Sequence, residues 1–124
     1  MMAADVQAVV SDSACLIGLE RIRYLEILPK LYGGIVIPEA VQSEIGFTFP
    51  WLSPKSVQNQ LLVESLKGQI GWGESEAIAL ALELESSILI LDDKKARKIA
   101  QQFNLVINRN DWPVTKGEAS SGHC

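Results

Sequence analysis

The sequence predicts an α/β fold in which a central, mostly parallel sheet carries helices on both faces. Three observations predict it: short apolar runs typical of buried strands, stretches with helical spacing that follow them, and the alternation of the two along the 124 residues. Such alternation requires crossover connections, which are right-handed in parallel sheets and place helices on the sheet faces. A chain of this length is expected to form one domain with a single core.

The first predicted unit is a strand that leads into a helix. Residues 6–10 form an almost unbroken apolar run that stops at a polar Ser-Asp-Ser turn. This pattern is typical of a strand covered on both faces. Residues 14–28 then carry apolar side chains at helical spacing, and Ser13 is the expected N-cap of this helix.

The second unit is less regular. A glycine pair at 33–34 breaks the chain, residues 35–37 form a short apolar strand, and a helix follows over residues 38–45 with proline at its first position. The aromatic residues and two prolines of residues 46–54 predict a loop. Residues 56–66 fit a modest helix or a strand that runs into one, and the pattern leaves both open.

The second half of the chain has the clearest pattern. Residues 74–85 are rich in Ala, Leu and Glu, which predicts a strong helix. The middle of this helix, residues 77–82, is apolar on every face, so the helix should be buried. Residues 87–91 form another apolar strand, residues 94–103 an amphipathic helix, and residues 105–107 a last short strand.

The domain is expected to span residues 1–108. Residues 109–124 show no periodicity and are rich in Gly, Ser and charge, which predicts an irregular, disordered tail. The apolar runs are far shorter than the roughly 20 residues that cross a bilayer, and the acidic start does not resemble a signal peptide. A cytoplasmic chain without a membrane partner is therefore expected.

Charge and composition narrow the classes of function. The net charge of −4 argues against a protein that holds nucleic acid on a broad basic surface, which needs clustered Lys and Arg. It does not argue against a nuclease, because bound cations can supply positive charge at the reaction centre. The only histidine, His123, lies in the predicted tail, so triad hydrolysis has no base. The glycines lack the spacing of a P-loop or dinucleotide motif, which disfavours nucleotide cofactors.

Acidic residues follow the two clearest strands. Asp12 comes after the first strand, and Asp92 and Asp93 come directly after the strand at 87–91. Because the carboxyl ends of parallel strands meet at one edge of a sheet, these acids are expected on one rim. Three further acids could reach the same crevice from neighbouring helices: Glu44, Glu74 and Glu76. Crowded carboxylates without basic partners repel one another unless a cation is present, and Mg²⁺ and Mn²⁺ favour oxygen ligands. The six acids therefore predict a site for Mg²⁺ or Mn²⁺.

Each acid also has an ordinary structural explanation. The two glutamates in the first turn of the helix at 74–85 would complement its macrodipole. One of the aspartates before the helix at 94–103 would serve as its N-cap. Asp12 would be a turn residue, and Glu44 a solvated residue on a helix surface. The prediction of a site therefore depends on the shared placement of the acids.

Four segments, in this order, are similar to the PIN-domain family. They are VVSDS at 9–13, IPEAV at 37–41 with Glu44 following, GESEAIALA at 73–81, and LDDKKAR at 91–97. The resemblance covers about residues 6–107 and is closest to the compact prokaryotic branch of predicted nucleic-acid-binding PIN proteins related to VapC-type toxins.

This resemblance implies a fold and an activity. The fold would be a PIN-like three-layer sandwich, and the activity that of an Mg²⁺- or Mn²⁺-dependent endoribonuclease. Such a chain would be the toxin of a toxin–antitoxin pair or a relative of one, with RNA as substrate and an antitoxin protein as a possible partner. The resemblance implies catalytic acids at four positions, with Glu74 as the alternative for the third and Asp92 close enough to share the fourth: Asp12, Glu44, Glu76 and Asp93.

Two other functions and one assembly stay open. Relatives continue past the last strand into a further turn and helix, whereas a polar tail follows here, so a catalytically degenerate PIN domain acting as a binding or dimerisation module is an alternative. A phosphoacceptor receiver domain fits less well, because Asp12 is flanked by serines and the lysines lie on a helix. A homodimer is expected from the surplus of apolar residues on the first helix, namely Leu19, Ile22, Tyr24, Leu25 and Ile27.

Overall fold

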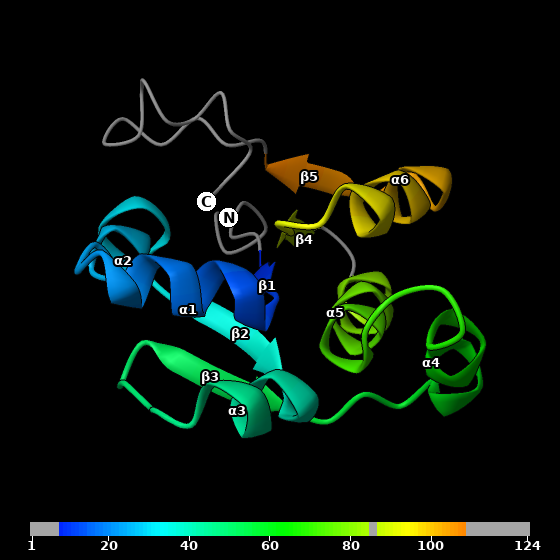
Figure 1. Cartoon of the computed structure of the whole chain (residues 1–124), viewed down its shortest axis with the longest axis horizontal. Coiled ribbons are helices and arrows are strands. Elements are labelled where there is room, and N and C mark those ends of the chain that lie inside the picture. Colours follow the sequence, from blue (N-terminus) through cyan, green and yellow to red (C-terminus); the bar gives the residue numbers. More distant parts are fainter. Residues whose placement is uncertain (1–7, 85–86, 109–124) are drawn as a thin grey trace, which may run out of the picture.

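The protein is described by a computed structural model that covers residues 8–84 and 87–108. Within these ranges the strands form one five-stranded sheet in the order β3-β2-β1-β4-β5, and every neighbouring pair is parallel (Figure 1). The predicted α/β fold with a parallel sheet is confirmed. The strands are β1 (Ala8–Ser11), β2 (Ile35–Pro38), β3 (Leu52–Lys55), β4 (Ser87–Ile90) and β5 (Val106–Asn108). The predicted tail at 109–124 and the first two residues of the predicted first strand lie outside the described residues.

Helices cover both faces of the sheet (Figure 1). One core lies between the sheet and three helices of the first half, and a second core lies between the sheet and three later helices. The first group comprises α1 (Ser13–Arg21), α2 (Ile27–Tyr32) and α3 (Glu39–Ile45). The second group comprises α4 (Gln60–Leu66), α5 (Trp72–Glu83) and α6 (Lys94–Gln102).

The unbroken apolar runs of the central strands follow from these two cores. Successive side chains of a strand point to opposite faces, so a strand covered on both sides must be apolar at every position. Val9 of β1 lies in the first core and Val10 in the second. Likewise, Leu89 of β4 lies in the second core and Ile90 in the first.

The expected single helix over 14–28 is wrong, because the structure has two helices there. Helix α1 ends at Arg21, and Arg23 adopts a left-handed backbone conformation with φ of 64° before α2 begins at Ile27. Leu25 and Leu28 nevertheless lie in the same core as the apolar side of α1. The apolar spacing therefore correctly predicted that these side chains are buried against one core. It could not predict whether the helix is continuous.

The segment predicted as a loop at 46–54 contains a strand. Residues 46–51 are irregular, with an aromatic stack in which the rings of Phe49 and Trp51 lie 5.3 Å apart. Strand β3 then pairs with β2 at the edge of the sheet, with Pro54 beside Ile37. An edge strand tolerates proline because one side of its backbone needs no partner, which is why the sequence signal was missed.

The remaining boundaries agree closely with the sequence pattern. Residues 56–66 were predicted as either a helix or a strand that runs into one, and the structure shows the helix α4 from Gln60 onward. Helix α5 begins at Trp72, two residues earlier than predicted, and its residues 77–81 are all buried as expected. None of the described helices is both long and apolar enough to cross a bilayer.

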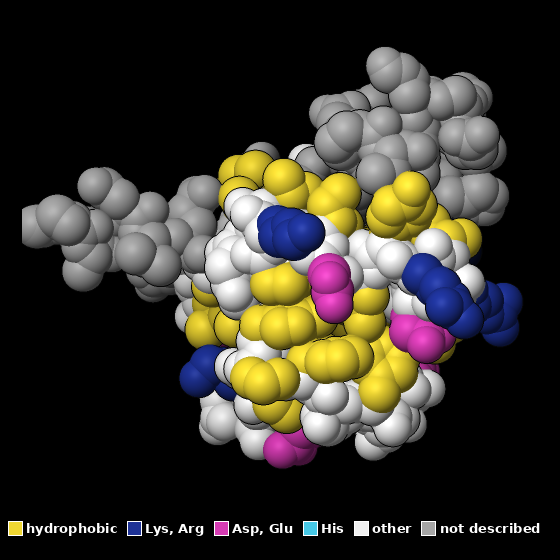
Figure 2. Space-filling model, turned by 90° about the vertical axis from the view of Figure 1, so that its left-hand side faces the viewer, with side chains coloured by type: hydrophobic (Ala, Val, Ile, Leu, Met, Phe, Trp, Pro, Cys, Tyr) yellow, Lys and Arg dark blue, Asp and Glu magenta, His cyan; other side chains and the backbone are white. Residues whose placement is uncertain are grey.

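The end of the molecule that carries the amino ends of β2 and β3 has an apolar surface. Figure 2 shows apolar side chains gathered on this face. Leu19 and Leu25, two of the residues on which the homodimer was predicted, are buried in the core. Ile22 and Tyr24 remain about half exposed, as does Leu31 of α2. The homodimer stays a prediction, and this face is where we expect its contact.

The order of the strands defines where a ligand would bind. The order reverses between β1 and β4, because the chain leaves β1 for α1 on one face and leaves β4 for α6 on the other. In open parallel sheets, ligands bind at the carboxyl ends of the strands at such a reversal point. Asp12 follows β1 at this position, and Asp92 and Asp93 follow β4.

Candidate active site

Asp12 joins the two strands at the reversal point. It is the N-cap of α1, the position predicted for Ser13, and its Oδ1 accepts a hydrogen bond from the Cys15 backbone N–H at 3.0 Å. Its Oδ2 accepts from the Asp92 backbone N–H at 3.1 Å, and its own N–H donates to the Ile90 carbonyl. The side chain is fully buried. Asp12 therefore holds a carboxylate at a fixed point between β1 and β4.

The environment of Asp12 favours its neutral form. Burial raises the pKa of the Asp12 carboxyl from 3.8 to about 7, although the two backbone hydrogen bonds act in the opposite direction. The charges of Glu74 and Asp92 contribute to this increase in pKa. A buried anion with anionic neighbours is unfavourable, so Asp12 needs either a proton or a cation near neutral pH.

Glu74 faces the same acids from the first turn of α5. Its Oε1 accepts a hydrogen bond from the Gly71 N–H at 2.9 Å, which fixes the side chain at the start of the helix. Burial raises the pKa of Glu74, and the Gly71 hydrogen bond lowers it. The charges of Asp93, Glu44 and Asp92 also raise this pKa. Since Glu74 also raises the pKa of Asp12, it interacts electrostatically with acids from three other segments.

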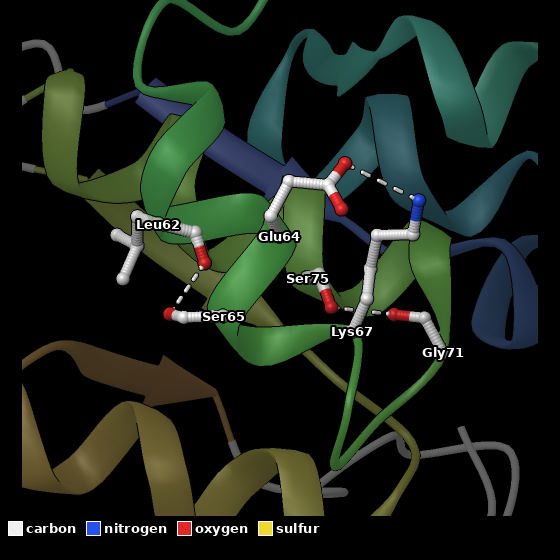
Figure 3. Close-up of polar contacts among 6 residues, drawn as sticks. All are labelled: Leu62, Glu64, Ser65, Lys67, Gly71 and Ser75. Carbon is white, nitrogen blue, oxygen red and sulfur yellow. Dashed lines mark hydrogen bonds and ion pairs between the residues drawn. The ribbon is translucent and has the colours of Figure 1, made fainter.

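The start of α5 is well anchored. The Gly71 carbonyl accepts hydrogen bonds from the Ser75 backbone N–H at 2.9 Å and from the Ser75 Oγ at 2.8 Å (Figure 3). At the end of the preceding helix, α4, the C-cap residue Lys67 forms a 3.5 Å salt bridge with Glu64 (Figure 3). The two Ser75 bonds hold the first turn of α5 in place, and the carboxylate with which Lys67 pairs is Glu64, outside the group of acids at the strand ends.

Glu44 and Asp93 approach Asp12 and Glu74 from the surface of the molecule. Glu44 is exposed on α3, and its Oε1 accepts a hydrogen bond from the Ser13 Oγ at 2.6 Å. Asp93 is the N-cap of α6, where its Oδ2 accepts from the Ala96 N–H at 2.8 Å, so the structural role expected for this position is present. Both residues also have a direct electrostatic effect on Glu74.

Glu76 has a different kind of partner from these acids. It is buried on α5, and its Oε1 accepts a hydrogen bond from the Ala40 N–H at 3.1 Å, in the first turn of α3. Its side chain therefore satisfies a backbone donor at the start of another helix. The geometry favours Glu74 over Glu76 as the third acid of the site, although Glu76 as a catalytic acid stays a prediction until a variant is measured.

We call Asp12, Glu44, Glu74, Asp92 and Asp93 the acidic cluster. Its donor chemistry fits Mg²⁺ or Mn²⁺, because every side chain offers carboxylate oxygens. Within residues 8–84 and 87–108, no salt bridge joins a Lys or Arg to Asp12, Glu44, Glu74 or Asp93. In the same part of the chain, no three acids are already placed as a ligand set for a metal ion. A cation would therefore have to draw the side chains of the acidic cluster together.

Comparison with known proteins identifies the family. A family model described as a PIN domain matches residues 8–109 of the chain. The chain belongs to the PIN-domain family. No curated protein and no solved structure matches it. The family supports a nuclease type of function, and the relation to VapC-type toxins stays a proposal.

The sequence pattern of this PIN domain did not single out two residues that shape the site. Ser13 was expected only as a helix cap, and it instead donates to Glu44. Gly73 was noted only as the first residue of the segment at 73–81, and it lies directly against the Glu44 carboxylate. A signal for both exists in hindsight: each directly neighbours an acid of the cluster in the sequence.

The raised pKa of Asp12 predicts a pH-dependent stability for the PIN domain. Between about pH 4 and pH 7 the folded chain holds a proton on Asp12 that the unfolded chain has released. The free energy of unfolding should therefore fall as pH rises through this window, by at most about 1.4 kcal/mol per pH unit, and level off above it. Urea unfolding in EDTA from pH 5.5 to 8 measures this slope.

Two variants test whether Asp12 is the source of the slope. Asp12→Asn cannot titrate, so its stability should vary less with pH. Glu20→Gln, which alters an exposed acid of α1 outside the acidic cluster, should retain the native slope. An Asp12→Asn chain with the native slope would place the extra proton on another group.

Proposed function

We propose that this PIN domain is an Mg²⁺- or Mn²⁺-dependent endoribonuclease, whose acidic cluster binds the metal. The observation that carries the proposal is the convergence of Asp12 with acids from three other segments at the point where the strand order reverses. Structural acids at helix starts would not need to share one crevice. In this proposal the third acid of the site is Glu74, and not Glu76 as the family resemblance implies.

The residues of the site have separable tasks in this proposal. Asp12 is held by two backbone N–H groups, so it offers a carboxylate whose position changes little when a proton is exchanged for a cation. Glu44 and Glu74 approach from different helices and would enclose the other side. When bound, a divalent cation would supply positive charge against the phosphodiester and would lower the pKa of water at the site, so that the water can lose a proton and act as the nucleophile.

The biological setting belongs to the same proposal. A chain of this kind would act on RNA in the cytoplasm as the toxin of a toxin–antitoxin pair or as a relative of one, with an antitoxin protein as its partner. The support is the resemblance of the four acidic segments to that branch of the family. The homodimer expected from the apolar face is part of this setting.

One observation favours a second candidate function. Among the described residues no three acids are pre-arranged to hold a metal, and both oxygens of Asp12 are already engaged by backbone donors. A degenerate PIN domain that serves as a binding or dimerisation module would show the same features. The two candidates differ in their response to metal.

Thermal unfolding with and without Mn²⁺, together with cleavage of end-labelled single-stranded RNAs, distinguishes the candidates. A metal that binds only the folded chain stabilises it by about 2.7 kcal/mol at a hundredfold excess over Kd, which raises the Tm by several degrees. We expect that shift at pH 7.5, together with RNA cleavage that EDTA abolishes. An unchanged Tm and intact RNA would favour the degenerate module.

A further inference from the structure

Gly73 in the first turn of α5 lies against the carboxylate of Glu44. A Cβ atom placed on Gly73 would be 2.5 Å from Glu44 Oε1, 3.3 Å from its Cδ and 3.5 Å from its Oε2. The whole carboxyl group thus lies over the backbone of Gly73, at a distance that any side chain at this position would obstruct. Only glycine leaves this space open.

The same carboxylate is held from a second direction. Ser13 Oγ donates a hydrogen bond of 2.6 Å to Glu44 Oε1, the atom that would be closest to a Cβ at position 73. Ser13 directly follows Asp12, and Gly73 directly precedes Glu74. Glu44, on α3, is therefore fixed between the first turns of the two helices that carry the other inner acids.

We infer that Gly73 is a positioning residue, whose missing side chain gives the Glu44 carboxylate its place next to Ser13 and within electrostatic reach of Glu74. This inference rests on the proposed function, because it assigns the open space to metal binding. The helix itself gives no reason for glycine here, since glycine is less favourable than alanine within a helix. The obstructed atoms belong to the far end of a flexible, exposed side chain, which can swing away without disturbing the fold.

Gly73→Ala should therefore separate metal binding from folding. We expect the Mn²⁺ affinity of the full chain, measured by isothermal titration calorimetry, to fall by about tenfold or more, because a ligand is turned out of its position. The Tm without metal should stay the same or rise, because alanine is more favourable than glycine within a helix and this gain offsets the loss of the exposed bond from Ser13 to Glu44. The matched control is Gly18→Ala, in α1, where a Cβ would meet nothing within 4 Å. Gly18→Ala should retain the native Mn²⁺ affinity, and a native affinity in Gly73→Ala would overturn the inference.

A second pair of variants tests whether Gly73 acts through Glu44. The shorter side chain of Glu44→Asp withdraws from α5 and weakens Mn²⁺ binding on its own. In that background Gly73→Ala should cause no further loss of affinity, because the shorter side chain no longer places its carboxylate next to position 73. Losses that simply add would show that Gly73 acts elsewhere.

A metal-free measurement keeps this inference separate from the proposed function. Ser13→Ala removes the hydrogen bond to Glu44 and should lower the Tm of the metal-free chain. In the Gly73→Ala background that bond is already broken, so the loss of Tm should be at most about half as large. Equal losses in both backgrounds would overturn the inference. Absent Mn²⁺ binding with unequal losses would instead overturn the proposed function and leave the placement of Glu44 by Gly73 supported.

Discussion

Replacing Asp12 by asparagine is expected to reduce RNA cleavage by about a hundredfold or more. The substitution retains the shape of the side chain but removes the innermost anionic ligand, and losing even about 3 kcal/mol of charge stabilisation in the transition state has this effect. The rise in Tm caused by Mn²⁺ should shrink with it. Single-turnover cleavage and thermal unfolding of the same preparations provide the two measurements.

The fold should respond to Asp12→Asn in a different way from the activity. Both carboxylate oxygens accept from backbone N–H groups, whereas asparagine has one acceptor, so either the Cys15 or the Asp92 N–H loses its partner. Such a loss costs about 1–3 kcal/mol in a buried site. At pH 8 the gain from removing a buried charge offsets this cost, so the variant should be less stable than the native chain mainly at low pH. Native cleavage by a folded Asp12→Asn chain would exclude Asp12 from the reaction.

The sequence was most informative where burial is complete. The apolar runs of β1 and β4 predicted central strands, because only a strand covered on both faces is apolar at successive positions. The strand ends then located Asp12, Asp92 and Asp93 at one edge. This reasoning needs no side-chain detail, since parallel topology alone brings the ends of neighbouring strands together.

The sequence was least informative where tertiary contacts decide. Nothing in the pattern shows that Arg23 takes up a left-handed conformation and divides the first helix, because the apolar residues on both sides point into one core. Nor could Pro54 be assigned to a strand before its place at the sheet edge was known. In both cases the local signal is weak, and the packing of distant segments determines the outcome.

The choice between Glu74 and Glu76 as the third acid of the site is likewise beyond what the sequence alone can predict. Glu74 and Glu76 are two residues apart at the start of α5, about 200° around the helix axis, so they must point in different directions. The sequence does not show which direction faces β1 and β4, and the resemblance to other PIN domains favoured Glu76. The hydrogen bond from Ala40 to Glu76 and the electrostatic effect of Asp93 on Glu74 favour Glu74, and the assignment of the third acid stays a prediction that variants test.

Glutamine at each position is therefore expected to give opposite results. Glu74→Gln keeps an oxygen for the Gly71 N–H but removes a charge from the acidic cluster, so the Tm shift caused by Mn²⁺ and RNA cleavage should both be largely lost. Without metal this variant should be as stable as the native chain or more so, because repulsion with Asp93 and Glu44 is relieved. Glu76→Gln retains an acceptor for the Ala40 N–H and should keep both the Mn²⁺ shift and cleavage.

A truncation at position 76 completes the comparison. Glu76→Ala leaves the buried Ala40 N–H without its acceptor, which should cost about 1–3 kcal/mol of stability and lower the Tm without abolishing the response to Mn²⁺. Thermal unfolding of all three variants, with EDTA and with Mn²⁺, is the measurement. If Glu76→Gln instead lost the metal response while Glu74→Gln kept it, Glu76 would be the ligand, and the Ala40 hydrogen bond would have to break when the metal binds.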